Sequence, residues 1–219
     1  MIKNLKTAIV IGATGLVGKF LTQNLLVDER YSFVKVFTRR SVGITDPKLR
    51  EHLVDFEKLN DWKNEITGDE LYSALGTTIK KAGSKAVQYK IDFSYQYESA
   101  QAAFQNGVEK YLLVSSAGAN KNSGNFYLKM KGELDMKVSS LGFKNILIFR
   151  PSILSGKRNE NRTAEKYGIA AMNILSRIIP PLKKYKPVEA ETVAKFMIRK
   201  ANESHIKNLM IFELNQITV

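Results

Sequence analysis

Short apolar runs alternate with longer amphipathic segments along the chain. The runs at 8–11, 33–38, 52–55, 71–75, 111–115, 146–149 and 209–214 have the length and composition of buried β-strands. Helical periodicity is found at 17–27, 85–106, 126–141, 163–179 and within 187–201. This alternation predicts an α/β fold in which helices cover both faces of a doubly wound parallel sheet.

Neither a repeat nor a low-complexity segment or linker interrupts this rhythm. We therefore expect residues 1–219 to form a single domain. The stretch 156–186 fits the rhythm least well, and we expect it to be a substrate-side insertion that forms part of small C-terminal substrate elements. The basic segment 79–84 is expected to be a loop that could cover a ligand.

A glycine-rich turn joins the first strand to the first helix, and this order is typical of a Rossmann-type dinucleotide-binding unit. Gly12 would allow the sharp exit from the strand. Gly15 would leave room for a pyrophosphate, and Gly18 would let the helix pack closely. The free N–H groups of the helix N-terminus favour bound phosphates. We expect cofactor contacts from Gly12, Thr14, Gly15, Leu16, Val17 and Gly18.

The residues after the later strands indicate which dinucleotide would bind. NAD-binding units place an acidic residue after the second strand, but this chain has Arg39 and Arg40 there. Two guanidinium groups attract a 2′-phosphate, which favours NADP(H) over NAD(H). Further cofactor contacts are expected at the ends of the third and fourth strands, from Asp55 and Phe56 near an adenine and from Leu75, Gly76 and Thr77.

Composition narrows the class of protein. With 44% hydrophobic and 25% charged residues, the chain reads as an ordinary globular protein. The absence of cysteine excludes disulfides, zinc thiolates and a thiol nucleophile, and it fits a cytoplasmic location. The lysines behind the net charge of +13 are scattered, so we do not expect nucleic-acid binding. No apolar run could span a membrane, and no room for a signal peptide precedes the first strand. We expect a monomer or homodimer.

Candidate chemistry is centred on Tyr127 and Lys131, whose spacing of four places both on one face of a helix. The ammonium favours the phenolate form, so the tyrosine could exchange a proton with a carbonyl or alcohol oxygen, while the lysine could also bind the nicotinamide ribose. Ser116, after the preceding strand, could hold the substrate oxygen. Tyr31 and Lys35 share the spacing, but in a strand they would not meet.

Other chemistries find little support in the sequence. The two histidines, His52 and His205, are far apart and in no ligand spacing, so neither a metal site nor a Ser-His-Asp triad is expected. The sequence also contains neither a nucleophile elbow nor a Walker loop.

The ordered motifs resemble a known family. They are the glycine turn, Thr38-Arg39-Arg40, DFEKL at 55–59, LGTT at 75–78, Ser115-Ser116, YLKMKGE at 127–133 and Arg150-Pro151. Together they resemble the atypical short-chain dehydrogenase/reductases, most closely the Tat-interacting-protein-like oxidoreductases. The resemblance implies an NADP-binding Rossmann fold, a site formed by Ser116, Tyr127 and Lys131, and a segment at Pro151 beside the nicotinamide.

Two features depart from that family pattern. Many members place an asparagine on the helix before the serine strand, whereas this chain has Asp92 near that place. The distance along the chain from the serine to the tyrosine is also shorter than usual, so that Ser115 rather than Ser116 could face the substrate.

Two functions are compatible with these residues. The first is an NADPH-dependent oxidoreductase that transfers hydride to a small carbonyl substrate, with Tyr127 as the proton donor. The second is a non-catalytic NADPH-binding redox sensor or scaffold with a regulatory protein partner, because a fold does not fix a function.

Overall fold

A parallel sheet forms the centre of the computed structural model, which describes residues 5–155, 187–204 and 207–217. Its seven strands follow the order β3-β2-β1-β4-β5-β6-β9, and every neighbouring pair is parallel. The chain order reverses at β1, which lies between β2 and β4, as in a doubly wound nucleotide-binding sheet. The strands are β1 Lys6–Ile11, β2 Tyr31–Thr38, β3 Leu49–Leu53, β4 Glu70–Ser73, β5 Lys110–Val114, β6 Asn145–Arg150 and β9 Leu209–Glu213.

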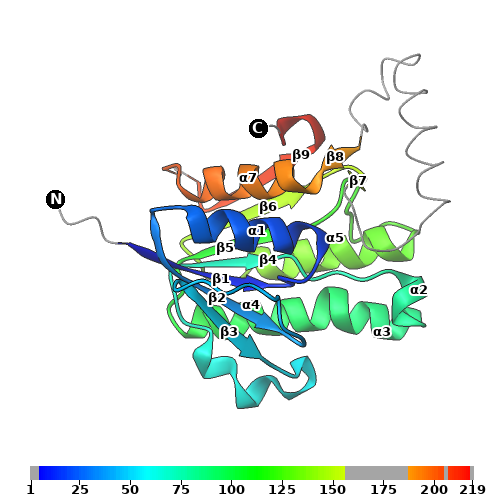
Figure 1. Cartoon of the computed structure of the whole chain (residues 1–219). Coiled ribbons are helices and arrows are strands. Elements are labelled where there is room, and N and C mark those ends of the chain that lie inside the picture. The colour runs from blue at the N-terminus through cyan, green and yellow to red at the C-terminus, as the bar shows by residue number, and fades with distance from the viewer. Residues whose placement is uncertain (1–4, 156–186, 205–206, 218–219) are drawn as a thin grey trace.

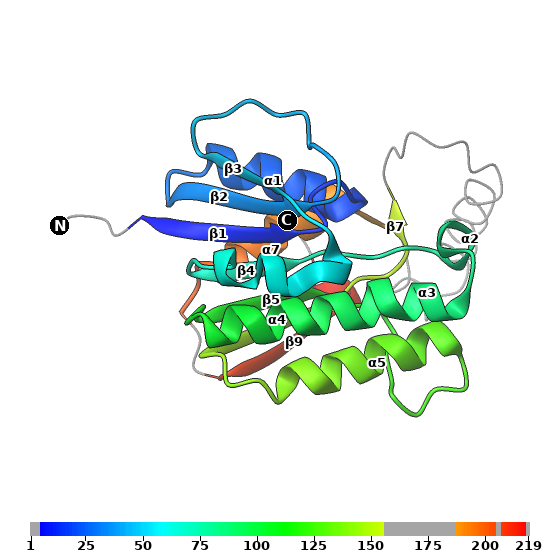
Figure 2. The same cartoon turned by 90° about the horizontal axis from the view of Figure 1, so that it is seen from below.

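Helices cover both faces of this sheet (Figure 1). On one face lie α1 (Leu16–Val27) and α7 (Ala190–Ala201), which pack against each other. On the opposite face, seen from below in Figure 2, lie α3 (Lys85–Tyr89), α4 (Tyr95–Gln105) and α5 (Phe126–Ser139). The expected three-layer α/β architecture is therefore confirmed.

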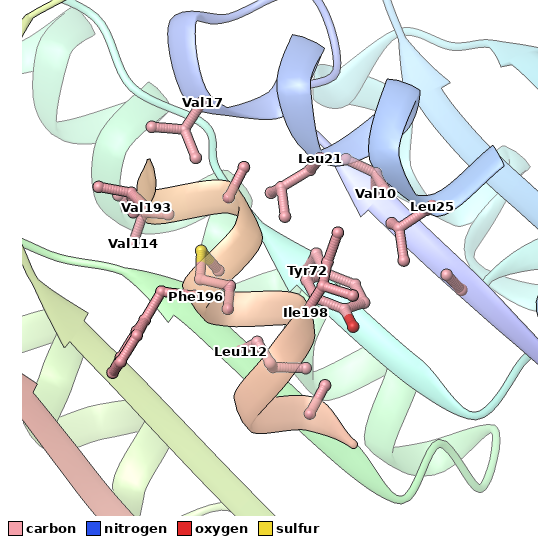
Figure 3. Close-up of a cluster of buried hydrophobic side chains, with 14 of the residues drawn as sticks. Val10, Val17, Leu21, Leu25, Tyr72, Leu112, Val114, Val193, Phe196 and Ile198 are labelled. Atoms are coloured by element: carbon pink, nitrogen blue, oxygen red, sulfur yellow. The ribbon is translucent and has the colours of Figure 1, made fainter. Parts of the chain in front are cut away.

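Each face has its own apolar core because strand side chains alternate. Figure 3 shows the core under α1 and α7, in which side chains from the helices meet those of the central strands. Leu21 and Leu25 of α1, Val193 of α7 and Val10 of β1 are fully buried there. Because successive residues of β1 face opposite cores, Ile9 and Ile11 belong to the second core, under α4 and α5.

A buried carboxylate ties the amino ends of the strands together. Glu70 of β4 is 0% exposed, and it accepts hydrogen bonds from Tyr31 Oη at 2.6 Å, Tyr72 Oη at 2.9 Å and Lys6 Nζ at 2.6 Å. Asn202, just after α7, donates to Tyr31 Oη at 2.9 Å. This cluster joins β1, β2, β4 and the end of α7 at the edge of the sheet opposite the glycine turn.

The structure differs from the sequence-based expectations in several places. The third strand covers Leu49–Leu53 rather than the expected 52–55. The segment 79–84 is not simply a loop, since α2 (Ile79–Ala82) begins it. The expected helix 85–106 is interrupted by a π turn at Lys90–Ser94. A small parallel pair, β7 (Leu154–Ser155) and β8 (Val188–Glu189), was not expected.

Short 3₁₀ segments follow β3 and β9, at Phe56–Asp61, Lys63–Glu65 and Leu214–Gln216. The expected helix 163–179 and the insertion 156–186 lie outside the described residues. Within the described residues, none of the helices combines the length and apolarity needed to cross a membrane.

Candidate functional site

The carboxyl ends of the parallel strands bring the sequence-predicted residues to one edge of the sheet. The glycine turn follows β1, the two arginines follow β2, and Leu75–Thr77 follow β4. The serine pair follows β5 and Pro151 follows β6. Open parallel sheets bind their ligands at this edge, beside the point where strand order reverses.

The glycine turn is built from backbone that fits closely against its surroundings. Gly12 has φ +85°, and a Cβ there would lie 2.5 Å from the carbonyl carbon of Ala74, the residue directly after β4. A Cβ on Gly18 would overlap the Gly12 carbonyl oxygen and lie 2.7 Å from its carbon. Gly18 therefore allows the first turn of α1 to pack on the glycine turn itself.

The N-terminus of α1 is open to an anionic group. Gly15 caps the helix without a side-chain hydrogen bond, and the first turn carries no acidic residue. Thr14 is exposed, Leu16 is half-buried, and Val17 packs into the core. Free backbone N–H groups and the positive end of the helix dipole suit a pyrophosphate, so the residues of this turn fit a dinucleotide.

The residues expected to lie near an adenosine are more exposed. Arg39 and Arg40 both lie in solvent directly after β2. Asp55 is exposed and caps a 3₁₀ turn by accepting the Glu57 N–H at 2.9 Å. Phe56 is only 5% exposed, with its ring edge-on to Trp62. A contact with the adenine was expected from this residue, but most of its side chain packs in the core.

The helix α5 presents Tyr127 and Lys131 one turn apart. Asn125 caps this helix by accepting the N–H groups of Tyr127 at 2.9 Å and Leu128 at 3.1 Å. Tyr127 is 37% exposed, whereas Lys131 is only 3% exposed, and the Lys131 ammonium lies 5.9 Å from the centroid of the tyrosine ring. A reachable phenol above a buried cation can exchange protons with a bound molecule.

A buried ion pair holds the lysine. Lys131 Nζ lies 3.3 Å from Oδ1 of Asp92, and both side chains are almost completely buried. Burial disfavours the charged lysine, but the Asp92 carboxylate, with Tyr127 and Asp135, outweighs this effect and raises the pKa of Lys131 above its ordinary value. The lysine is therefore an ammonium ion at neutral pH.

The two serines after β5 have different surroundings. Ser115 is buried near the carboxylate of Asp135 on α5, but its hydroxyl has no hydrogen-bond partner among the described residues. Burial raises the pKa of Asp135, while Ser115 and Arg150 oppose this rise. Ser116 is half-buried at the edge of the sheet, with its hydroxyl 3.4 Å from the Ala117 carbonyl oxygen. Since Ser115 is only 5% exposed whereas Ser116 is half-buried, Ser116 is the more accessible of the two hydroxyls to a substrate.

The sequence reasoning overlooked a second charged group beneath the site. Arg150 at the end of β6 binds Asp135 with its Nε at 3.0 Å and Glu213 of β9 with a terminal nitrogen at 2.8 Å. Asp135 lies four residues after Lys131, so helical spacing could have revealed it. The contact between Asp92 and Lys131 has no such local signal, because the two residues are distant in sequence.

Tyr31 and Lys35 behave as expected for residues in a strand. Tyr31 is fully buried in the Glu70 cluster, whereas Lys35 Nζ donates to Thr67 at 2.7 Å. The two side chains therefore take part in different contacts, and the Tyr-x-x-x-Lys spacing carries no chemistry at this position.

Solved structures with a similar fold include UDP-sugar epimerases and enzymes in complex with NAD. A UDP-N-acetylglucosamine 4-epimerase from Methanobrevibacter ruminantium superposes with a TM-score of 0.69 at 15% identity, covering 96% of this chain and 77% of the epimerase. The Bordetella bronchiseptica enzyme WbmG in complex with NAD gives a TM-score of 0.68 at 12% identity, covering 96% of this chain and 73% of WbmG. At these identities the likeness establishes the Rossmann-like fold alone.

Curated relatives are closer in sequence, although no family model matches. The mitochondrial protein fmp52 of Aspergillus niger is 33% identical over 193 residues, which cover 85% of this chain and 82% of the relative. The rat protein HTATIP2 is 34% identical over 164 residues, covering 73% and 67%. With the Rossmann-like fold, these similarities show that the chain belongs to the HTATIP2/FMP52 family of NAD(P)-binding atypical short-chain dehydrogenase/reductases.

Proposed function

We propose that this protein is an NADPH-dependent oxidoreductase that reduces the carbonyl group of a small substrate, with Tyr127 as the proton donor. The observation that carries the proposal is the exposed Tyr127 phenol one helical turn above the buried Lys131 ammonium, at the sheet edge that also holds the glycine turn. Membership in an NAD(P)-binding family supports the nucleotide part of the proposal.

The backbone of the glycine turn would hold the pyrophosphate, and Arg39 and Arg40 would pair with a 2′-phosphate. The NADPH preference rests on these two arginines, since the solved structures of similar fold include complexes with NAD. Leu75, Gly76, Thr77 and Pro151 would border the cofactor beyond the turn. Lys131 would bind the nicotinamide ribose through its ammonium group.

When bound, reduced nicotinamide supplies the hydride that reaches the substrate carbonyl carbon. Tyr127 would give its phenolic proton to the carbonyl oxygen, so that the carbonyl becomes an alcohol. The Ser116 hydroxyl would donate a hydrogen bond to the same oxygen and stabilise the charge that develops there. The Lys131 ammonium would stabilise the phenolate left behind, which solvent can reprotonate because Tyr127 is 37% exposed.

Loss of NADPH absorbance with a panel of aldehydes, ketones and quinones tests this proposal. Replacing Tyr127 with phenylalanine should lower turnover by about 10²–10⁴-fold, the usual contribution of a general acid, and leave NADPH affinity unchanged. Tyr97→Phe on α4 is a matched control because Tyr97 is a half-buried tyrosine that packs against the apolar core under α4. Undiminished turnover in the Tyr127 variant would refute the proton-donor role.

A second outcome would assign the other candidate function. If the wild-type protein binds NADPH tightly but turns over no compound of the panel, the nucleotide would act as a signal that controls a protein partner. Partner binding that changes when NADPH is added would then support the sensor.

A further inference from the structure

A π turn places a carboxylate in the interior of the site. The helical stretch after α2 widens at Lys90–Ser94, and Asp92 in this turn is 1% exposed. Gln96 Nε2 donates to the Asp92 carbonyl oxygen at 2.6 Å, which satisfies one backbone group of the turn. Single π turns inside helices are frequent at functional sites, which favours a functional role for Asp92.

The two oxygens of the Asp92 carboxylate bind two different parts of the site. Oδ1 lies 3.3 Å from Lys131 Nζ on α5. Oδ2 accepts the backbone N–H of Thr77 at 2.8 Å, in the segment that follows β4. Gln88, one turn before Asp92, donates to the Thr77 carbonyl oxygen at 3.3 Å. One side chain thus connects the segment expected to contact the nucleotide with the lysine expected to act in catalysis.

Asp92 has no substitute in this position among the described residues. Asp135 also lies on α5 near Lys131, but its Oδ2 accepts from Arg150 Nε at 3.0 Å, and among the described residues the ion pair of Lys131 is with Asp92. Tyr127 contributes a phenol on the solvent side. A buried ammonium without a paired counter-ion is forced toward its neutral form, so the charge of Lys131 depends on Asp92.

We propose that Asp92 is a positioning residue: its carboxylate keeps Lys131 charged and fixed beneath Tyr127, and it fixes the Thr77 segment to the same point. This role rests on the proposed reductase function, in which Lys131 acts on the ribose and on Tyr127. Asp92 itself touches neither substrate nor cofactor in this scheme.

Replacing Asp92 with asparagine tests the role because the amide has the same shape but cannot make both contacts. Its oxygen can accept from either Lys131 or Thr77, and its NH₂ group would then face a second donor. An NMR titration of the full chain with isotope-labelled lysine, with the Lys131 signal assigned through Lys131→Arg, reads the charge directly. In D92N this signal should titrate at lower pH than in the wild type.

Affinity for NADPH gives a second readout, independent of turnover. Loss of the charge-assisted bond from Thr77 should weaken NADPH binding about tenfold in D92N. Glu109→Gln is the matched control, since it makes the same chemical change in the exposed Lys144–Glu109 pair and should alter neither readout. An unchanged Lys131 titration together with unchanged NADPH affinity in D92N would overturn the proposal.

A further variant covers the case in which D92N does not fold. Combining D92N with Lys131→Met removes both buried charges, so no unpaired cation remains. Its NADPH affinity should be about tenfold below that of Lys131→Met alone, and equal affinities would refute the contact to Thr77. If these shifts occur in a protein that turns over no substrate, the role of Asp92 stands and only the proposed reaction fails.

Discussion

Gly18→Ala tests whether the glycine turn depends on close packing rather than on backbone freedom. A Cβ at this position would overlap the Gly12 carbonyl oxygen and lie 3.0 Å from the Cα of Ala13. Alanine is better than glycine inside a helix by about 1 kcal/mol, which acts in the opposite direction. Overpacking against backbone costs about 1–3 kcal/mol or more. Because the overlap is with the backbone of the glycine turn, which cannot move aside as a flexible side chain can, we expect a net loss of about 1–2 kcal/mol.

The same displacement should damage nucleotide binding. Relieving the overlap moves the start of α1 away from the turn, so the N–H groups of the two elements can no longer converge on one pyrophosphate. We expect NADPH affinity to fall by about tenfold or more, a change of about 1.4 kcal/mol or more. Urea unfolding and a fluorescence titration with NADPH measure the two effects separately.

Gly124→Ala serves as the control, because a Cβ there meets no atom within 4 Å. That variant should be as stable as the wild type or slightly more stable, since alanine restricts the unfolded chain. A Gly18→Ala protein with wild-type stability and wild-type NADPH affinity would show that the packing of α1 on the turn is unimportant.

Three further predictions concern charge. Replacing both Arg39 and Arg40 with serine should weaken NADPH binding about 10–100-fold and have little effect on NADH binding. Parallel titrations measure the two affinities, and an unchanged ratio between them would remove the basis for the NADPH preference. Glu70→Gln should lower the free energy of unfolding in urea by about 2–3 kcal/mol, because it leaves buried donors without their charged acceptor, and a loss below about 0.5 kcal/mol would contradict this. The Arg30 guanidinium lowers the pKa of Asp28 below 3.8. The pairing of Asp28 with Arg30 therefore stabilises the fold above pH 3.8, and this stabilisation is lost as the pH falls through the lowered pKa. Asp28→Asn should therefore unfold at a lower temperature than the wild type near pH 6 but approach it in strong acid, whereas a constant difference across this range would be inconsistent with the pairing.

Local patterns were sufficient for much of the fold. The apolar runs marked the strands of the sheet, and the glycine spacing marked the turn between β1 and α1. The spacing of Tyr127 and Lys131 put both on one face of α5, since helical geometry depends only on sequence separation. Strand boundaries were less accurate at β3, where pairing with β2 rather than apolar content sets the limits.

Tertiary structure decided how the site is connected. The sequence places Asp92 near the position of the family's asparagine without giving its partner, and the π turn and the packing of α5 bring it to Lys131. Ser115 and Ser116 are chemically identical, but packing buries Ser115 and leaves Ser116 half-buried at the edge of the sheet. Phe56 is apolar in either role, and its packing against Trp62 assigns it mainly to the core. Each of these outcomes depends on contacts between residues far apart in the chain. By itself, the sequence determined which residue types stand at the positions that the proposed chemistry would use, whereas their partners and burial were set by the packing of helices on the sheet.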